Sequence, residues 1–391
     1  MVLDKNEFGR LVRAYREQRG WTQEELAERW GHSRAYISQI EGGRRKVDST
    51  AQLVRLADIL DIPQEKLEAI GRGIPQRKVK ATSPQEADNA ILQMLLAPGR
   101  DMVRLAYMVW LGDQHPVFEE SLHDLIVEID QALTLYHGEF VKPAQHLLAY
   151  AHQMKGRIAF DRLDFAAASG HFSEMIDLGQ ELHDADIITT GMAYQGSILR
   201  KRGRFETALR NYEAARPYAE VASPGVRGNY YLMLATVHAD AGQEDGFLRA
   251  TDTALEIAAE LKDSIENLAN DFSLDDALWA QAGGLIELWK PEKSLEIFKE
   301  TDRLRPFRPL REQGAYLINK GKAYLFMGDL DRGIKLSLRG LQLARKYKSR
   351  RHAGWLERTY HRVLALPFGK DKRLNDLRDA VMEVKREQSD W

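Results

Sequence analysis

The stretch TQEELAERWGHSRAYISQIEGGRRK, residues 22–46, decides how the first part of the chain folds. Thr22 followed by Glu25 forms a capping box, in which each residue's side chain caps the backbone of the other at the start of a helix. Gly31 ends that helix, and Ser33 is a favourable N-cap for the next one, which a pair of glycines stops. Two short helices joined by three to four residues with a glycine have the proportions of a helix-turn-helix.

The second of these helices carries a polar outer face. Leu26, Ile37 and Ile40 are expected to face the core. The other side chains then lie toward the outer and amino-terminal side of the helix: Arg34, Ala35, Tyr36, Ser38 and Gln39. Arginine reads guanine, glutamine reads adenine, and alanine can lie against a thymine methyl group. Three cations follow where DNA phosphates would pass: Arg44, Arg45 and Lys46.

Flanking segments complete a small helical domain. Apolar spacing predicts a helix over residues 4–19, a fourth helix from near Asp48 or Ser49, and a fifth after Pro63. For a helix-turn-helix pattern alone, a three-helix core with a solvated charged face is an equal alternative. The capping box, the glycine stop and the basic loop occur in register, which favours DNA binding, although Arg45 and Lys46 taken singly are equally consistent with solvated charge.

Residues 8–60 resemble the phage-repressor helix-turn-helix family, the xenobiotic-response-element type related to lambda Cro and CI. The resemblance rests on residues 22–27, 33–40 and 41–44. It implies that Gln23 binds a phosphate, that Arg44 touches the DNA backbone and that Tyr36 faces the sugar-phosphate or a base. It implies base-facing roles for Ser33, Arg34, Ala35, Ser38 and Gln39, and a structural ion pair between Arg16 and Glu41. Some relatives carry a polar base reader at the position of Ala35, so direct specificity would rest on Arg34 and Gln39.

Charge is unevenly distributed along the chain. Its 391 residues are 44% apolar and 29% charged with a net charge of −2, as in ordinary soluble globular proteins. Residues 1–80 contain 16 Lys and Arg against 12 Asp and Glu, a net charge of +4. The remainder contains 40 against 46, a net charge of −6. A basic first part suggests an anionic partner.

Several kinds of chemistry have no support in the sequence. The absence of cysteine excludes disulfides, cysteine-ligated zinc and a cysteine nucleophile. The histidines are dispersed, and no Walker loop, GxGxxG, HExxH or GxSxG pattern occurs. No apolar run approaches the ~18–20 residues of a membrane span, and no secretion segment begins the chain. We expect a cytoplasmic protein that is not an enzyme and has no metal, no cofactor and no membrane contact.

The rest of the chain repeats itself. Gly156 is followed at offsets of 9, 12 and 16 by Phe165, Ala168 and Phe172, and Gly196 by Phe205, Ala208 and Tyr212 at the same offsets. Weaker copies begin at Ala235, Ala282 and Gly321. Small residues at the anchor and at offset 12 would let two helices pack closely, and the aromatic residues would fill the gap between one pair and the next. Prolines, Pro98 among them, are expected at element edges.

This pattern resembles the tetratricopeptide repeat with longer helices. It predicts an all-α protein: a five-helix helix-turn-helix domain followed by a right-handed α-solenoid of tetratricopeptide-like pairs with a concave groove. Residues 85–140 are expected to hold degenerate pairs, and residues 351–388 a terminal capping pair. A stretch rich in Gly, Pro and cations reads as a linker. We therefore expect domains over residues 1–71 and 85–391, joined by residues 72–84.

A phage-repressor-type head joined to such repeats resembles the RRNPP group of bacterial regulators. The group binds short signalling peptides in the repeat groove and changes how paired heads meet DNA. The resemblance implies a homodimer, double-stranded DNA with a palindromic operator, and a short peptide ligand. Candidate ligand contacts are Asn229, at a position expected to face the groove, and Gln153, Arg157, Arg200, Lys201 and Lys322 at comparable inner offsets.

The positions of the other asparagines do not complete the set expected to contact a peptide backbone. Asn319 is expected to face sideways, and Asn267 and Asn270 precede a repeat of uncertain register. Ordinary solenoid surface is the alternative for every polar residue named as a ligand contact. Two alternative functions follow: a constitutive repressor whose repeats only dimerise, and an adaptor whose groove binds the tail of a partner protein.

Overall fold

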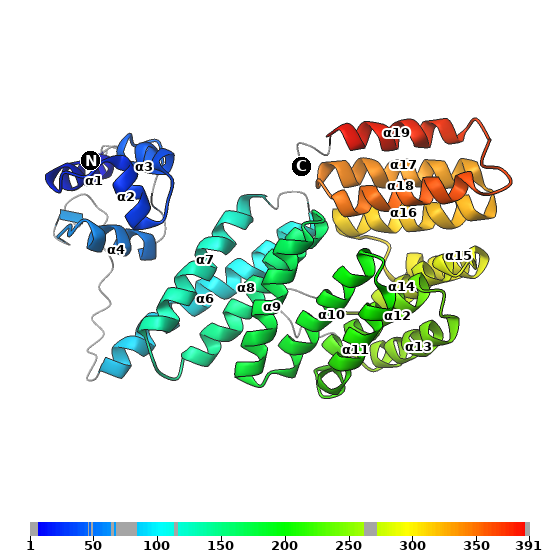
Figure 1. Ribbon diagram of the computed structural model, residues 1–391, viewed down its shortest axis with the longest axis horizontal. Helices are drawn as coiled ribbons and strands as arrows, with labels where there is room; N and C mark the ends of the chain where they lie inside the picture. The colour runs from blue at the N-terminus through cyan, green and yellow to red at the C-terminus, as the bar shows by residue number, and fades with distance from the viewer. Residues whose placement is uncertain are drawn as a thin grey trace. The chain divides into compact units, whose positions relative to one another are not determined.

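The computed structural model describes residues 7–45, 47, 50–63, 66–67, 84–112, 116–261 and 272–387. The chain divides into two compact units, Met1–Thr82, here called the head, and Ser83–Trp391, here called the body. All regular structure among the described residues is helical, which confirms the all-α class (Figure 1). None of the described helices combines the length and apolarity needed to cross a membrane.

The head is built from four described helices: α1 (Glu7–Gln18), α2 (Gln23–Trp30), α3 (Arg34–Glu41) and α4 (Thr50–Ile59). Trp30, Ile37, Ile40 and Leu56 are buried in its core. Beyond Pro63 only residues 66–67 are described, so the predicted fifth helix lies largely outside the described residues.

Local sequence signals set the turn between α2 and α3. The backbone N–H of Glu25 donates to Thr22 Oγ1 at 3.2 Å, and the backbone N–H of Thr22 donates to Glu25 Oε2 at 2.7 Å, so the capping box is present. Gly31 ends α2 with φ at +77°, a conformation that costs glycine little. Ser33 then caps α3 by accepting a hydrogen bond from the backbone N–H of Tyr36 at 3.2 Å.

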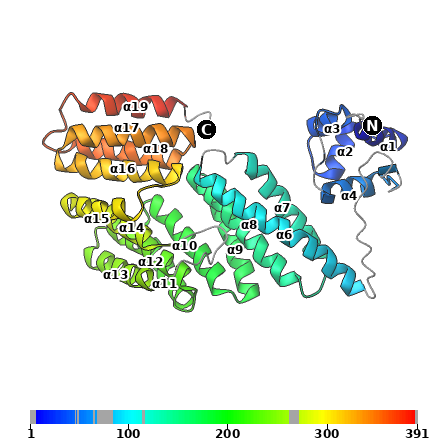
Figure 2. The same ribbon diagram turned by 180° about the vertical axis from the view of Figure 1, so that it is seen from behind.

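The body is a stack of helix pairs that begins with two long helices (Figure 2). Its helices are α6 (Pro84–Leu111), α7 (Pro116–Leu135), α8 (Val141–Asp161), α9 (Phe165–Leu182), α10 (Ala185–Lys201), α11 (Phe205–Ala219), α12 (Pro224–Asp240), α13 (Glu244–Glu260), α14 (Leu274–Glu287), α15 (Pro291–Leu304), α16 (Leu310–Met327), α17 (Leu330–Lys346), α18 (Arg350–Leu364) and α19 (Leu374–Glu387). The two helices of each pair pack against each other, and each pair packs against the next. The predicted succession of stacked helix pairs is therefore confirmed.

Aromatic residues at offset 16 cover the anchor glycines. A Cβ atom on Gly156 would lie 2.6 Å from the ring of Phe172, and one on Gly196 would lie 2.4 Å from the ring of Tyr212. Each ring therefore packs inside its own helix pair. The prediction that these rings fill only the gap between one pair and the next is wrong. Phe172 also reaches the next pair, because it stacks on Tyr194 of α10 with ring centroids 4.6 Å apart.

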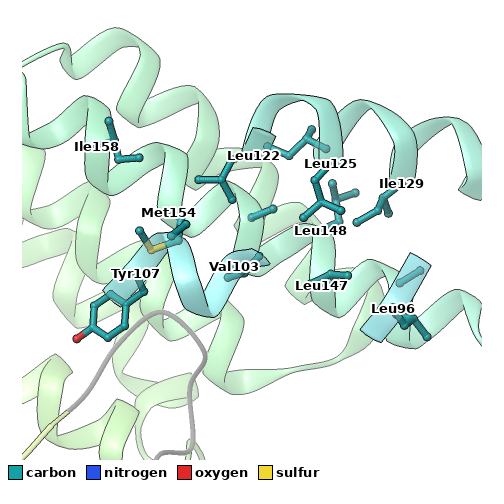
Figure 3. Close-up of a cluster of buried hydrophobic side chains, with 14 of the residues drawn as sticks. Leu96, Val103, Tyr107, Leu122, Leu125, Ile129, Leu147, Leu148, Met154 and Ile158 are labelled. Atoms are coloured by element: carbon teal, nitrogen blue, oxygen red, sulfur yellow. The ribbon is translucent and has the colours of Figure 1, made fainter. Parts of the chain in front are cut away.

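Pro98 does not mark a helix boundary. It lies inside α6, so its predicted place at an element edge is wrong. Tertiary packing overrides the local signal: α6, α7 and α8 share an apolar core that includes Leu96, Val103 and Leu147 (Figure 3). Gly99 follows the proline, and a Cβ there would lie 2.5 Å from the side chain of Leu147, so the backbone of α6 approaches α8 closely at this point.

A buried group of charged and polar side chains closes the solenoid on itself. Asp161, at the end of α8, accepts hydrogen bonds from Arg311 Nη1 at 2.6 Å, Ser349 Oγ at 2.9 Å and Arg351 Nε at 3.1 Å. These donors lie 150 to 190 residues further along the chain. We call Asp161, Arg311, Ser349 and Arg351 the clasp, because they join the early helix α8 to the late helices α16 and α18.

Charge pairing inside the clasp compensates for its burial. Asp161 and Arg311 have side-chain exposures of only 3% and 2%. Burial alone would raise the pKa of Asp161, but the guanidinium groups of Arg311 and Arg351 outweigh it and hold the pKa well below its usual range. Arg311 also donates from Nε to the carbonyl oxygen of Trp110 at 2.6 Å, which attaches α16 to α6.

The glycine packing predicts opposite effects for two matched substitutions. Gly196→Ala should destabilise the body by roughly 1–3 kcal/mol, because the new methyl group overlaps the buried ring of Tyr212. Gly170→Ala, on α9 with nothing within 4 Å of the added Cβ, should stabilise it by roughly 0.5–1 kcal/mol through higher helix propensity. Thermal unfolding followed by circular dichroism measures both, and shifts of the same sign would contradict the packing described.

Candidate DNA-binding face and ligand cavity

The exposed face of α3 carries most of the residues expected to read bases. Arg34, Ala35 and Gln39 are exposed and Ser38 is half-buried. Arg34 retains 69% side-chain exposure and lies 3.9 Å from Glu24 of α2, a weak and solvated pairing. Ser33 uses its oxygen to cap α3, which leaves its hydroxyl proton available to a ligand.

Tyr36 does not point outward as predicted. Its side chain is buried, and its ring stacks on His32 with centroids 4.4 Å apart and packs against Trp30. The large ring fills the space inside the turn between α2 and α3, so it supports the helix instead of extending the outer face. Arg45 is positioned through this ring, since its guanidinium carbon lies 4.5 Å from the ring centroid.

Of the residues expected near phosphates, Gln23 is held by a buried ion pair, whereas Arg44 is exposed. Arg16 and Glu41 form the buried ion pair expected between them, with contacts of 2.5 and 2.9 Å. Gln23 Nε2 donates to Glu41 Oε2 at 2.9 Å, so the first turn of α2 is tied to that pair. Arg44 is exposed at the end of α3. Lys46 lies outside the described residues.

A cavity of about 650 Å³ lies on the inner side of the body. Side chains from the first helix of each pair line it, that is α6, α8, α10, α12, α14, α16 and α18. Most of the predicted ligand contacts are on its wall: Arg157, Arg200, Lys201, Asn229 and Lys322. Asn319, expected to face sideways, is there too. The clasp residues Arg311 and Arg351 also form part of the wall.

Gln153 is the predicted contact that the cavity does not include. Its side chain is fully buried within α8, whereas only the carboxyl-terminal part of that helix, with Arg157 and Phe160, reaches the cavity wall. The repeat offset predicted that Gln153 faces the groove, but an offset alone does not distinguish a buried position from one on the cavity wall. Asn267 and Asn270 lie outside the described residues.

Aromatic rings form much of the cavity wall. Six of them come from five separate helices: Tyr107, Trp110, Phe160, Tyr194, Trp279 and Trp355. The guanidinium carbon of Arg157 lies 4.5 Å from the ring centroid of Trp110 and 5.0 Å from that of Tyr107. Apolar walls with a few polar groups are typical of sites that bind small organic ligands.

Most cations on the wall have carboxylate partners. Arg200 Nη1 lies 2.9 Å from Asp240 Oδ2, and both Lys322 and Arg362 contact Glu287. Burial would raise the pKa of Glu287, but Lys322 and Arg362 outweigh burial and lower the pKa to about 2. The Arg200–Asp240 and Lys322–Glu287 pairs join neighbouring first helices, and the Arg362–Glu287 pair joins α18 to α14.

Sequence analysis missed the contribution of α18. Residues 351–388 were expected only to form a capping pair, yet Arg351, Trp355, Arg358 and Arg362 line the cavity. Their spacing of four, three and four residues puts them on one helix face, a signal that the sequence does contain. This helix face could not be assigned to the cavity from the sequence alone, because the contact between α18 and α8 depends on the clasp.

Two histidines expected to be dispersed meet between α8 and α9. The Nδ1 atoms of His152 and His171 are 3.1 Å apart. Burial, with a smaller effect from His171, lowers the pKa of His152 to about 4, so the ring is neutral at neutral pH. Among the described residues no group of three or more His, Asp or Glu is arranged to hold a metal ion.

Comparisons with known proteins identify the head. A family model described as a helix-turn-helix domain matches residues 7–70. The chain is 37% identical over 101 residues to the HTH-type transcriptional repressor RghR of Bacillus subtilis (strain 168), which covers 26% of this chain and 73% of that protein. It is 38% identical over 60 residues to the uncharacterized HTH-type transcriptional regulator YazB of the same organism, covering 15% of this chain and 86% of that protein. The chain therefore belongs to the family of helix-turn-helix, DNA-binding transcriptional regulators.

Solved structures give weaker matches to the whole chain. The apo form of the competence regulator ComR from Streptococcus vestibularis covers 92% of this chain and 98% of its own, with a TM-score of 0.29 and 11% identity. The match to the PrgX/iCF10 complex covers 88% of this chain and 98% of that one, with a TM-score of 0.28 and 11% identity. Similarity at this level carries no information about function.

The buried carboxyl group of Glu312 predicts a pH-dependent stability. Burial raises its pKa to about 7; Arg305 opposes this rise and Asp276 adds to it. Because the pKa of an unfolded glutamate is about 4.3, the folded chain binds an extra proton between these values, and stability falls as pH rises through this window by up to about 3 kcal/mol. In Glu312→Gln this loss should disappear.

Melting temperatures of the wild type and Glu312→Gln at pH 5 and pH 8 test this expectation. At pH 8 the melting temperature of Glu312→Gln should rise relative to that of the wild type. Glu292→Gln, at an exposed position of α15, is the matched control and should follow the wild type. Parallel pH curves for wild type and Glu312→Gln would rule out a raised pKa at this site.

Proposed function

We propose that the head binds a palindromic operator as one half of a homodimer, with α3 in the major groove. The observation that carries this proposal is the exposed row of Arg34, Ala35 and Gln39 on a helix whose opposite face is buried. In regulators of this architecture, paired heads contact half-sites one helical turn apart, roughly 34–36 Å.

The contacts proposed for α3 follow from side-chain chemistry. Arg34 would hydrogen bond a guanine, Gln39 an adenine, and Ala35 would lie against a thymine methyl group. The hydroxyl groups of Ser33 and Ser38 would reach neighbouring base edges. Phosphate contacts would come from Gln23, Arg44, Arg45 and Lys46, and these would set affinity more than sequence preference.

We infer further that the body binds a short peptide in its cavity. The cavity volume of about 650 Å³ falls within the range of known small-ligand sites. The amide groups of Asn229 and Asn319 on its wall can each donate and accept, which suits the N–H and C=O groups of a peptide backbone. The aromatic walls would accommodate apolar peptide side chains.

Contact between the ligand and the clasp would couple the two functions. Arg311 and Arg351 hold Asp161 and also face the cavity, so a ligand that touches them changes the free energy of solenoid closure. A ligand can shift that equilibrium only by its difference in affinity for the two states. A change in closure would in turn alter how two heads are presented to DNA.

A genome-wide DNA pull-down with the purified full-length chain, with and without spent culture medium, tests the proposed function. Discrete palindromic sites whose occupancy changes with medium are expected. Sites indifferent to medium would favour a constitutive repressor or an adaptor for an intracellular partner. Absence of discrete sites would contradict operator binding by the head.

Base reading by α3 is tested with one arginine variant. Arg34→Ala should weaken operator binding by about 1–3 kcal/mol and relax the sequence preference at one position of each half-site. Arg13→Ala is the control, because Arg13 is an exposed arginine on α1, not on α3, and pairs with Glu17 at 2.7 Å. An unchanged preference in Arg34→Ala would remove Arg34 from base reading.

A further inference from the structure

Most cations on the cavity wall contact a carboxylate. Arg200, Lys322 and Arg362 pair with Asp240 or Glu287 on other first helices, and Arg311 and Arg351 contact Asp161. Within the part of the chain that the structure describes, neither Lys201 nor Arg358 has a carboxylate oxygen within 4 Å of its charged nitrogens. Both line the cavity.

Lys201 and the clasp residue Arg351 lie beside one aromatic ring, that of Trp355. Lys201 Nζ lies 5.2 Å from the ring centroid of Trp355, and the guanidinium carbon of Arg351 lies 5.4 Å from it. Arg358 follows Trp355 by three residues on the same face of α18, whereas Lys201 ends α10. Closure of the solenoid therefore brings positive charge from two distant helices to one place on the wall.

Burial and neighbouring cations act against the charge of Lys201. Burial lowers the pKa of Lys201 well below its usual value, and nearby Arg200, Arg358 and Arg351 lower it further against the opposing effect of Asp240. Burial also lowers the pKa of Arg358, where Asp240 and Glu287 oppose the effect more strongly than Arg200 adds to it, so the repulsion between cations falls mainly on Lys201. An anion bound between the two side chains would relieve this repulsion.

We propose that Lys201 and Arg358, beside Trp355, form a carboxylate subsite of the cavity. The inference rests on the proposed peptide binding and narrows its ligand to a peptide that presents a carboxylate next to an apolar or aromatic side chain. The guanidinium group of Arg358 offers paired donors that match a carboxylate, Lys201 adds a point charge, and Trp355 provides the adjoining apolar surface. The carboxylate comes from the peptide C-terminus or from an Asp or Glu side chain.

Native mass spectrometry of the full-length chain with two random heptapeptide libraries tests the subsite. One library has free C-terminal carboxylates and the other has C-terminal amides. Preferential retention of the free-acid library identifies the C-terminus as the source, and enrichment of Asp and Glu within the amide library identifies a side chain. In the Lys201→Gln/Arg358→Gln double variant the preference should fall about tenfold, the effect of losing charged hydrogen bonds.

Control measurements keep folding and function separate from the subsite. Lys335→Gln, at an exposed position of α17, should retain the wild-type preference. Removing a poorly compensated cation should leave the melting temperature of Lys201→Gln equal to or above that of the wild type. If the double variant does not fold, the same library comparison with Lys201→Gln alone gives the decisive result, a reduced preference for anionic peptides.

Other outcomes overturn the proposal in distinguishable ways. Retention of peptides without regard to their charge would overturn the carboxylate subsite and leave peptide binding intact. Failure to retain peptides from either library would overturn peptide binding and the subsite together. Stabilisation of the wild type, but not of Lys201→Gln, by inorganic phosphate without any retained peptide would assign the site to a free anion instead.

Discussion

The buried carboxylate of Asp161 is the group on which the architecture of the body depends. It joins α8 to α16 and α18 through Arg311, Ser349 and Arg351, which follow it by 150 residues or more. A buried ion pair stabilises only while every charge keeps its partner, and the loss of one partner typically costs about 3–5 kcal/mol. Because α18 is held against α8, the inner faces of the repeats, α18 included, line one common cavity. The site and the closure are therefore one structural feature.

Features encoded by neighbouring residues could be predicted from the sequence. The capping box at Thr22 and Glu25, the turn at Gly31 and the cap at Ser33 each depend on a few adjacent residues, and all occur as expected. The repeated glycine anchors also predicted the helix pairs. A glycine at the anchor leaves space for the large ring that follows it by 16 residues, on the second helix of the pair. Helical offsets also led to five residues that line the cavity: Arg157, Arg200, Lys201, Asn229 and Lys322.

Features that depend on packing between distant elements could not be predicted. Tyr36 has a helical position that faces outward by periodicity, but the size of its ring suits the space beside His32 and Trp30. Gln153 has the expected repeat offset, yet its side chain is fully buried and does not reach the cavity wall. Closure of the solenoid depends on a small rotation added by every pair, so nothing in the vicinity of Asp161 or Arg351 predicts that they meet. For the same reason Trp355 and Arg358 were not recognised as part of a site.

The clasp holds the body closed, and the absence of native cysteine makes this closure directly measurable with spin labels. Spin labels attached at Ala167→Cys on α9 and His361→Cys on α18, both exposed positions, report the separation of the two ends by double electron–electron resonance. One narrow distance distribution is predicted for the otherwise wild-type chain, with a longer and broader one when Asp161→Asn is added. Asp331→Asn, which disturbs only an exposed pair with Arg373, should leave the narrow distribution intact. An unchanged distribution in Asp161→Asn would contradict the account.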